Sequence, residues 1–204
     1  MATKRQLDKY RPFGVKGYVY SGSGSISVIG KICKSEGWKK VLLVIDPGVL
    51  SAGGADSIIK HVEEAGLEYR IFSEIKPNPL QADIETIGFP MYQEMGADAI
   101  IAVGGGSAMD SAKGIAMMGD SGKTIDELEK ILFDLDPHVA TPWHTFPMIC
   151  IPTTFGTGSE VIRNAVISDP TGHKLVPMHD CILPAYAIED PDLMATLPAH
   201  VAAA

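Results

Sequence analysis

Two segments rich in glycine and hydroxyl side chains most constrain the fold, because each of them includes or follows a strongly apolar run. Residues 104–116 read GGGSAMDSAKGIA, and residues 151–161 read IPTTFGTGSEV. Glycines and short hydroxyl side chains at the end of a buried strand leave backbone N–H groups open to a ligand, and such groups bind anions at the start of a helix. The two segments therefore favour a phosphate-bearing cofactor.

The apolar runs lack the alternation that is typical of half-exposed strands. Residues 39–46 and 97–103 each form a nearly continuous apolar run, and residues 148–151 form a third. Continuous runs are expected for strands that are covered on both faces, as in a parallel sheet. The sequence therefore predicts a mainly parallel sheet flanked by helices.

Three helices are expected between the strands. An apolar stripe from Ile58 to Ala65 is followed by Gly66, which is a common helix stop. A second stripe covers residues 84–95, where Pro90 should kink or split the helix. Residues 124–127 read TIDE, which is the sequence of a capping box. Alternating strands and helices indicate an α/β, Rossmann-like fold.

The pattern changes after residue 160. Residues 164–168 and 174–178 flank the turn sequence DPTG, which predicts a β-hairpin. Residues 190–194 are a plausible helix start, and the final VAAA resembles a helix cut short. We expect one α/β domain over residues 1–189 and the truncated start of a helical domain over residues 190–204, with the rest of that C-terminal helical domain absent.

The glycine turn has two readings. Gly104, Gly105 and Gly106 carry no Cβ, so they can take positive φ and let a pyrophosphate approach the backbone. Ser107 and Asp110 have capping-box spacing, so we expect a helix that begins near Ser107, with Asp110 as a cap and not as a phosphate contact. Spacing alone also fits a plain strand-to-helix turn without a ligand.

Asp46 also has two readings. It follows the apolar run 41–45, where a carboxylate can accept hydrogen bonds from a ribose and repel a 2′-phosphate, which favours NAD over NADP. It can equally cap the Asp-Pro-Gly turn that it begins. Residues 21–25, SGSGS, lack the GxGxxG spacing, and we interpret them as a turn and helix cap before Ile26.

The segments GGGSAMDSAK and PTTFGTGSEV, at this separation, resemble the iron-containing (group III) alcohol dehydrogenases, and the resemblance covers essentially the whole chain. It implies the NAD(H)-binding half of an enzyme that transfers hydride between NAD(H) and an alcohol or aldehyde. It also implies iron or zinc in the full-length enzyme, with ligands from the helical domain and none bound by this chain alone. It further favours the ribose role of Asp46.

The resemblance places NAD contacts in the strand ends, the glycine turn, the hydroxyl-rich loop and the hairpin. The implied contacts are Asp46, Asn78, Gly104, Gly105, Gly106, Ser107, Met109, Thr153, Thr154, Thr157, Asn164 and Lys174. Two departures from the family pattern are Ala108-Met109 and Ile162, where the family often has a small residue or Pro and a Thr. A contact at Ile162 is therefore doubtful.

Other functions find little support in the chain. The six histidines include no pair at the i, i+4 spacing of a helical metal site, and GSEV is not the GxSxG elbow of a hydrolase, so catalytic residues remain unassigned. A net charge of −8 with scattered basic residues argues against nucleic acid. No apolar run approaches the ~20 residues of a membrane span.

The remaining expectations concern location and partners. The N-terminus lacks the apolar stretch of a signal peptide, and Cys33, Cys150 and Cys181 lack metal-like spacing, so we expect a cytoplasmic protein in which Cys150 is buried and inert. We expect an alcohol or aldehyde substrate and a homo-oligomer, dimer or larger, in the full-length form. The face expected to meet the helical domain consists of Met178, Leu193, Met194 and Leu197.

Two alternatives remain open. The chain by itself could be a nucleotide-binding module without catalysis. It could also be a relative that shares the fold, such as a glycerol or glycerol-phosphate dehydrogenase or a dehydroquinate synthase. The complete GTGSEV sequence favours the alcohol dehydrogenase branch.

Overall fold

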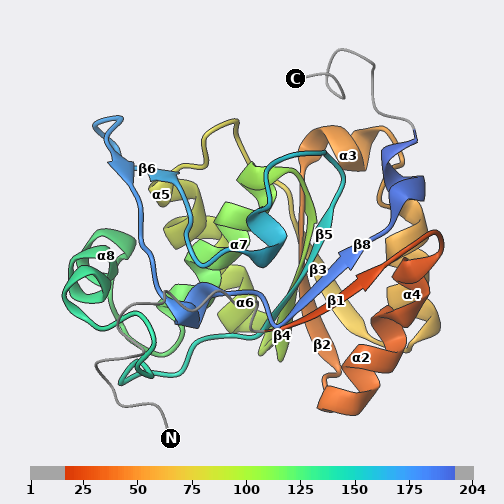
Figure 1. The fold of residues 1–204 in the computed structure, drawn as a ribbon, viewed down its shortest axis with the longest axis horizontal. Helices are drawn as coiled ribbons and strands as arrows, with labels where there is room; N and C mark the ends of the chain where they lie inside the picture. The colour runs from red at the N-terminus through yellow and green to blue at the C-terminus, as the bar shows by residue number, and fades with distance from the viewer. Residues whose placement is uncertain (1–16, 196–204) are drawn as a thin grey trace, which may run out of the picture.

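The computed structural model describes residues 17–195, and its centre is a six-stranded sheet in which every pair of neighbours is parallel (Figure 1). The strand order is β1-β8-β5-β4-β2-β3. The strands are β1 (Tyr18–Ser21), β2 (Lys40–Ile45), β3 (Glu68–Phe72), β4 (Ala99–Gly104), β5 (Met148–Pro152) and β8 (Tyr186–Glu189). The predicted α/β fold with a mainly parallel sheet is confirmed.

The central strands send alternate side chains into two apolar cores. Leu42 and Ile100 belong to the core on one face, whereas Leu43 and Ile101 belong to the core on the other. Helices α6 (Phe89–Met95) and α7 (Gly106–Met118) cover the first face, and α2 (Ile29–Glu36) and α4 (Asp56–Glu64) cover the second (Figure 1). Because both faces are buried, these strands need apolar residues at every position.

The chain reverses its direction across the sheet between β2 and β4. From β2 it first adds β3 on one side, and it then returns to place β4, β5 and β8 on the other side. Ligands of open parallel sheets bind outside the carboxyl ends of the strands at such a switch point. Here Asp46 follows β2 and the glycine turn follows β4, and the N–H of Asp46 donates to the carbonyl of Val103 at 3.0 Å.

The predicted helices are present, and the second one is interrupted as expected. The stripe from Ile58 becomes α4, and Gly66 follows it with φ 72°. The stripe over residues 84–95 is divided into α5 (Gln81–Asp83), a π-helical turn η2 (Ile84–Gly88) and α6. Pro90 lies in the first turn of α6, where its missing N–H is not needed. The wider π turn before it accommodates the break in the α-helical hydrogen bonding.

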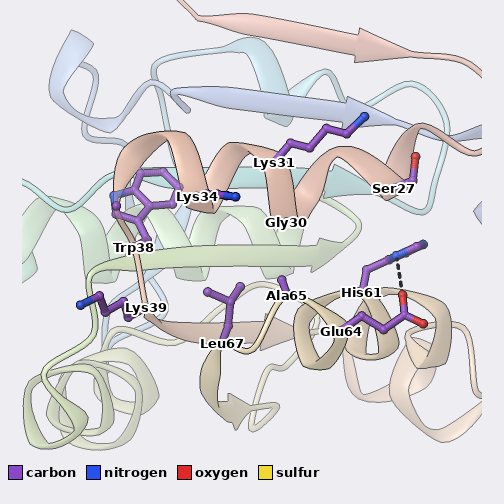
Figure 2. A pocket seen from close by; sticks show the side chains of 11 residues that line it. Ser27, Gly30, Lys31, Lys34, Trp38, Lys39, His61, Glu64, Ala65 and Leu67 are labelled. Atoms are coloured by element: carbon purple, nitrogen blue, oxygen red, sulfur yellow. Dashed lines mark ion pairs between the residues drawn. The ribbon is translucent and has the colours of Figure 1, made fainter.

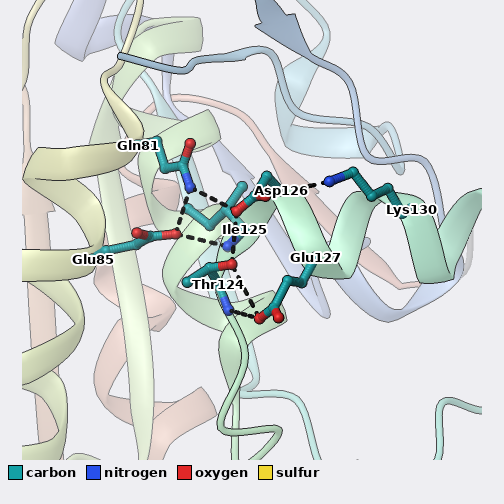
Figure 3. A network of polar contacts seen from close by, with 7 residues as sticks. All are labelled: Gln81, Glu85, Thr124, Ile125, Asp126, Glu127 and Lys130. Carbon is teal, nitrogen blue, oxygen red and sulfur yellow. Dashed lines mark hydrogen bonds and ion pairs between the residues drawn. The ribbon is translucent and has the colours of Figure 1, made fainter.

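The predicted capping box starts α8 (Ile125–Asp134), and it also joins this helix to the interrupted one (Figure 3). The backbone N–H of Thr124 donates to Glu127 at 3.0 Å. The N–H of Ile125 donates to Glu85 at 2.7 Å, and the Gln81 amide donates to the same carboxylate oxygen at 2.9 Å. Glu85 therefore acts as a second cap, supplied from η2.

The predicted hairpin is also confirmed. Strands β6 (Ile167–Ser168) and β7 (Lys174–Leu175) pair antiparallel, and a bridge between Asn164 and Met178 extends the pairing. The remaining elements are α3 (Pro47–Ser51) and four 3-10 turns: η1 (Ser25–Val28), η3 (Ser159–Val161), η4 (Asp180–Ile182) and η5 (Pro191–Met194).

The segments near both ends of the described residues can be compared with the elements that the sequence predicts there. The expected helix start at residues 190–194 is the 3-10 turn η5, and the helix opening expected at residues 201–204 lies outside the described residues. Residues 21–25 form the expected turn, with Gly24 in the left-handed region before η1. Within residues 17–195, no helix is long and apolar enough to cross a membrane.

Candidate cofactor site

Gly104 lets the ends of two strands pack closely. Its φ is 148°, and a Cβ added there would lie 2.8 Å from the Cβ of Asp46 and 2.9 Å from the Cβ of Ala108. Any other residue would therefore push apart β2 and the start of α7. Gly105 has φ −86° and Gly106 is helical, so only the first glycine of the turn uses the conformational freedom that the sequence offers all three.

Gly105 and Gly106 instead keep space open toward the hydroxyl-rich loop. A Cβ on Gly105 would lie 3.1 Å from Thr154 Oγ1, and a Cβ on Gly106 would lie 3.7 Å from the Thr157 side chain. The structure thus brings the two sequence motifs together across a narrow gap. α7 has 13 residues and starts at Gly106, not at Ser107, with no side-chain hydrogen bond at its N-cap. The expected Ser107–Asp110 capping box is therefore wrong.

The hydroxyl-rich loop holds two buried polar atoms that lack a protein partner. Among the described residues, Thr153 Oγ1 and Thr154 Oγ1 are buried and make no hydrogen bond. The backbone N–H of Thr153 donates to the carbonyl of Gly104 at 3.0 Å, which fixes the loop beside the glycine turn. Thr157 Oγ1 accepts a longer bond, 3.4 Å, from the N–H of Ser159. Buried hydroxyls without partners destabilise a fold, so these two are open to hydrogen bonds from a bound ligand.

Asp46 is seen as a helix cap. Its Oδ1 accepts from the N–H of Gly48 at 2.8 Å and from the N–H of Val49 at 3.1 Å, and α3 begins directly after it. The reading as a turn cap is confirmed. Because both bonds go to the same oxygen, the cap is compatible with a second contact through Oδ2, and the ribose role stays a prediction.

Asn78 and Lys174 come together although they are far apart in the sequence. Lys174 Nζ donates to Asn78 Oδ1 and to Ser168 Oγ, each at 2.8 Å. Asn78 has φ 61°, which is uncommon for a residue other than glycine. These residues line a cavity of about 360 Å³ between the β6–β7 hairpin and the segment after β3. The second half of the predicted site therefore lies at the hairpin.

Two of the predicted contacts need correction or qualification. The side chain of Met109 is fully buried in the apolar core, and its N–H donates to the carbonyl of Gly105, so the structure does not place Met109 where it could contact a cofactor. The position of Met109 just after the glycine turn does not reveal that its side chain lies on the core face of α7. Asn164 lies in the segment that joins the hydroxyl-rich loop to the hairpin, and its carbonyl accepts from Lys113 at 2.8 Å.

A buried charged cluster lies behind the two motifs, and the sequence analysis did not assign it. Lys113 Nζ donates to Ser159 Oγ at 2.9 Å and lies 3.9 Å from Asp110. Asp110 accepts from Ser159 Oγ at 2.9 Å and from the N–H of Val166 at 3.0 Å, so it is not a helix cap. Burial raises the pKa of Asp110 and lowers the pKa of Lys113, while each charge partly offsets the effect on the other. The signal in the sequence was the i, i+3 spacing of the two residues, which places them on one helix face.

Two further cavities flank the fold. The larger, about 530 Å³, lies between α2 and α4, where Lys31 and Lys39 point outward and Trp38 closes one end (Figure 2). None of its lining residues has a buried polar atom without a partner. The smaller, about 290 Å³, is lined by Thr154, Glu160 and other residues beside the hydroxyl-rich loop. The unpartnered Thr153 and Thr154 hydroxyls favour this side as the candidate ligand site, although the larger cavity lies elsewhere.

The described residues do not fit a metal. Between residues 17 and 195 there is no group of three or more His, Cys, Asp or Glu side chains that could hold an ion. A catalytic zinc commonly takes three protein ligands.

Comparison with known proteins gives a consistent result. The sequence model described as iron-containing alcohol dehydrogenase matches residues 17–191. A choline dehydrogenase of Bacillus subtilis (strain 168) is 34% identical over 204 residues, which span 97% of this chain and 48% of that protein. An NAD-dependent methanol dehydrogenase of Bacillus methanolicus is also 34% identical, over 87% of this chain and 45% of that protein.

Solved structures agree with the sequence relatives. A 1,3-propanediol oxidoreductase matches with a TM-score of 0.81 and 33% identity, over 95% of this chain and 49% of that one. A sulfoacetaldehyde reductase from Bifidobacterium kashiwanohense in complex with NAD+ matches with a TM-score of 0.81 and 25% identity, over 94% and 49%. The chain spans about half the length of the curated relatives it matches.

Proposed function

The chain belongs to the iron-containing alcohol dehydrogenase family, and we propose that it is the NAD(H)-binding half of an enzyme that transfers hydride between NAD(H) and an alcohol or aldehyde. One observation carries this proposal. The unpartnered hydroxyls of Thr153 and Thr154 lie beside the glycine turn, at the switch point of a parallel sheet. This is where a dinucleotide binds to such sheets.

The site offers what a pyrophosphate needs. The first N–H groups of α7 have no side-chain cap, and the helix dipole favours negative charge at this end. Gly105 lets the ligand approach the backbone, while the threonine hydroxyls offer hydrogen bonds without adding charge. NAD(H), when bound, supplies the hydride chemistry, and these residues orient it. Asn78 and Lys174 at the hairpin would then contact the part of the dinucleotide beyond the pyrophosphate.

The names of the relatives limit the choice of cofactor more than they limit the choice of substrate. Their names include an NAD-dependent methanol dehydrogenase and a reductase in complex with NAD+. They also include choline and 1,3-propanediol dehydrogenases, so the substrate names differ widely. We therefore propose NAD(H) as the cofactor and leave the substrate as an alcohol or aldehyde. Iron or zinc would belong to the full-length enzyme.

Oligomerisation and location are further proposals. We propose a homo-oligomer, dimer or larger, for the full-length enzyme and a reducing compartment such as the cytoplasm for this chain. All three cysteines are free, and Cys150 lies fully buried in β5, where burial raises the pKa of its thiol to about 12. Such a thiol is inert at neutral pH, as the sequence predicts.

The test of this function uses Asp46→Asn. The asparagine keeps the oxygen that caps α3 and removes the charge that would repel a 2′-phosphate, so stability should change little. We expect the wild-type chain to bind NADH at least about ten-fold more tightly than NADPH, and the variant to lose most of that preference. Fluorescence titration of both cofactors measures the two affinities.

The control is Lys34→Gln, which changes the cavity between α2 and α4 and should leave both affinities as they are. Absence of NADH binding to the wild-type chain would refute the proposed function. Equal binding of NADH and NADPH would refute only the role of Asp46.

A further inference from the structure

Lys113 is a fully buried charge in the middle of α7. Lysine is almost never fully buried unless its ammonium group is paired, because removing the charge from water is costly. Here the ammonium donates to Ser159 Oγ and to the carbonyl of Asn164, and Asp110 lies at 3.9 Å. The partners that offset the cost of burial therefore come largely from outside the helix.

Asp110 reaches the same outside segment. One of its oxygens accepts from Ser159 Oγ, and the other accepts from the backbone N–H of Val166. The hydrogen bonds of both charged side chains of α7 thus go to residues 159–166. Among the described residues, these bonds reach no other segment. Ser159 is shared by the two charges, since it accepts from Lys113 and donates to Asp110.

The segment held by these bonds connects the two halves of the candidate site. It follows Thr153–Thr157 after Gly158, and it leads into the β6–β7 hairpin that carries Lys174. α7 itself begins at the glycine turn. The cluster of Asp110, Lys113 and Ser159 therefore connects the helix that begins at the glycine turn to the segment between the hydroxyl-rich loop and the hairpin.

We propose that Asp110, Lys113 and Ser159 are positioning residues for the dinucleotide. They hold the segment 159–166 against α7, so that the threonine hydroxyls and the hairpin face the glycine turn. This role rests on the proposed function, because it assumes that NAD(H) binds there. The three residues do not contact the cofactor; they act through the loop.

Charge chemistry gives a reason for such a role. Replacing a buried ion pair by apolar side chains of similar size is often neutral or stabilising, so the pair is not needed merely to hold the domain together. Removal of one charge alone leaves the other uncompensated and endangers folding. The informative variants are therefore Ser159→Ala, which removes a neutral hydroxyl, and the paired replacement Asp110→Leu with Lys113→Met.

The experiment uses the full 204-residue chain and three measurements. Hydrogen exchange without cofactor reports the protection of residues 153–166, thermal melting reports global stability, and titration with NADH reports binding. Ser111→Ala is the matched control, because Ser111 is buried on the same helix but its hydroxyl donates to the carbonyl of Ser107 within α7. Ser159→Thr keeps the hydroxyl and serves as the rescue variant.

We expect Ser159→Ala and the paired replacement to raise exchange in residues 153–166, to keep the sheet protected, and to weaken NADH binding about ten-fold or more. Ser111→Ala should show neither effect, and Ser159→Thr should restore both. Unchanged exchange in residues 153–166, or unchanged NADH affinity in a folded variant with increased exchange, would overturn the positioning role. Failure of the wild-type chain to bind NADH would overturn the proposed function and, with it, this role, whatever the exchange shows.

Discussion

Gly104 and Gly106 lie two residues apart in the same turn, but the structure constrains them differently. Gly104→Ala would place a Cβ 2.8 Å from Asp46 at φ 148°, and we expect it to lower the free energy of unfolding by about 2–4 kcal/mol. Gly106→Ala meets nothing closer than 3.7 Å in a helical conformation, and it should be neutral or stabilising by up to about 1 kcal/mol. Urea unfolding of both variants measures the difference. Equal effects would contradict the close packing of β2 against the start of α7.

At the scale of single residues, the sequence predicts which residue types gather at the candidate site better than it predicts where each side chain points. The glycine turn and the threonines do lie together, because each follows a neighbouring parallel strand and the carboxyl ends of such strands share one edge. Asp110 differs from the cap that its spacing predicts, and Met109 differs from the cofactor contact that the family resemblance implies. Local spacing at a helix start resembles a cap, whereas the fold turns this part of α7 toward the core and toward residues 159–166. The i, i+3 spacing places Asp110 and Lys113 on one helix face, but it does not indicate which distant residues they bind.

The capping box of α8 is the element whose stability is easiest to test. Thr124→Ala should lower the free energy of unfolding by about 1 kcal/mol, and Thr124→Ser should not. Hydrogen bonds from Thr124 hold the pKa of Asp126 and of Glu127 below their ordinary values of 3.8 and 4.5. A lowered folded pKa stabilises the fold above the unfolded pKa, and that contribution is lost as the pH falls through the folded value.

The pH dependence separates this cap from a packing effect. The difference in stability between wild type and Thr124→Ala should therefore be largest near neutral pH and should shrink as the pH falls below about 4. Urea unfolding at several pH values measures it, with Lys130→Gln as a control for the exposed ion pair to Asp126. A difference that stays constant down to pH 3 would show that the bonds from the Thr124 hydroxyl to the two carboxylates contribute little, since the bond from the backbone N–H of residue 124 to Glu127 remains in the variant.

At the scale of elements, burial decides what the sequence can predict. β2, β4 and β5 are covered on both faces, so their sequences are continuously apolar and stand out. β1 is exposed along its length, so its pattern does not separate it from a loop, whereas β3 alternates before its buried Phe72 and has only five residues to carry that strand pattern. Pro90 correctly predicts an interruption, but not that a π turn takes it up, because that choice depends on how η2 packs against α7.

The whole molecule presents apolar side chains on its surface. Met178 is 52% exposed and Leu193 and Met194 are partly buried, while Leu197 lies outside the described residues. These exposures do not show that the four residues form one face, so that face stays a prediction. The carboxyl end of the sheet, where we propose that the dinucleotide binds, is by contrast assembled within the chain. We expect cofactor binding to be a property of this chain and alcohol oxidation not to be.

The last prediction follows from that division. The 204-residue chain, supplied with NAD+, iron or zinc and a short alcohol or diol, should form no NADH above the rate without protein. Residues 17–195 provide no cluster of His, Cys, Asp or Glu that could hold a metal. Without a Lewis acid an alcohol keeps its high pKa, so almost no alkoxide is present at neutral pH to give up a hydride. The assay follows absorbance of NADH, with a full-length member of the family as the positive control and NADH binding to the same sample as proof of a competent site. Sustained turnover that Gly105→Val abolishes, in a variant shown to be folded by circular dichroism, would establish a catalytic site within this chain and refute the prediction.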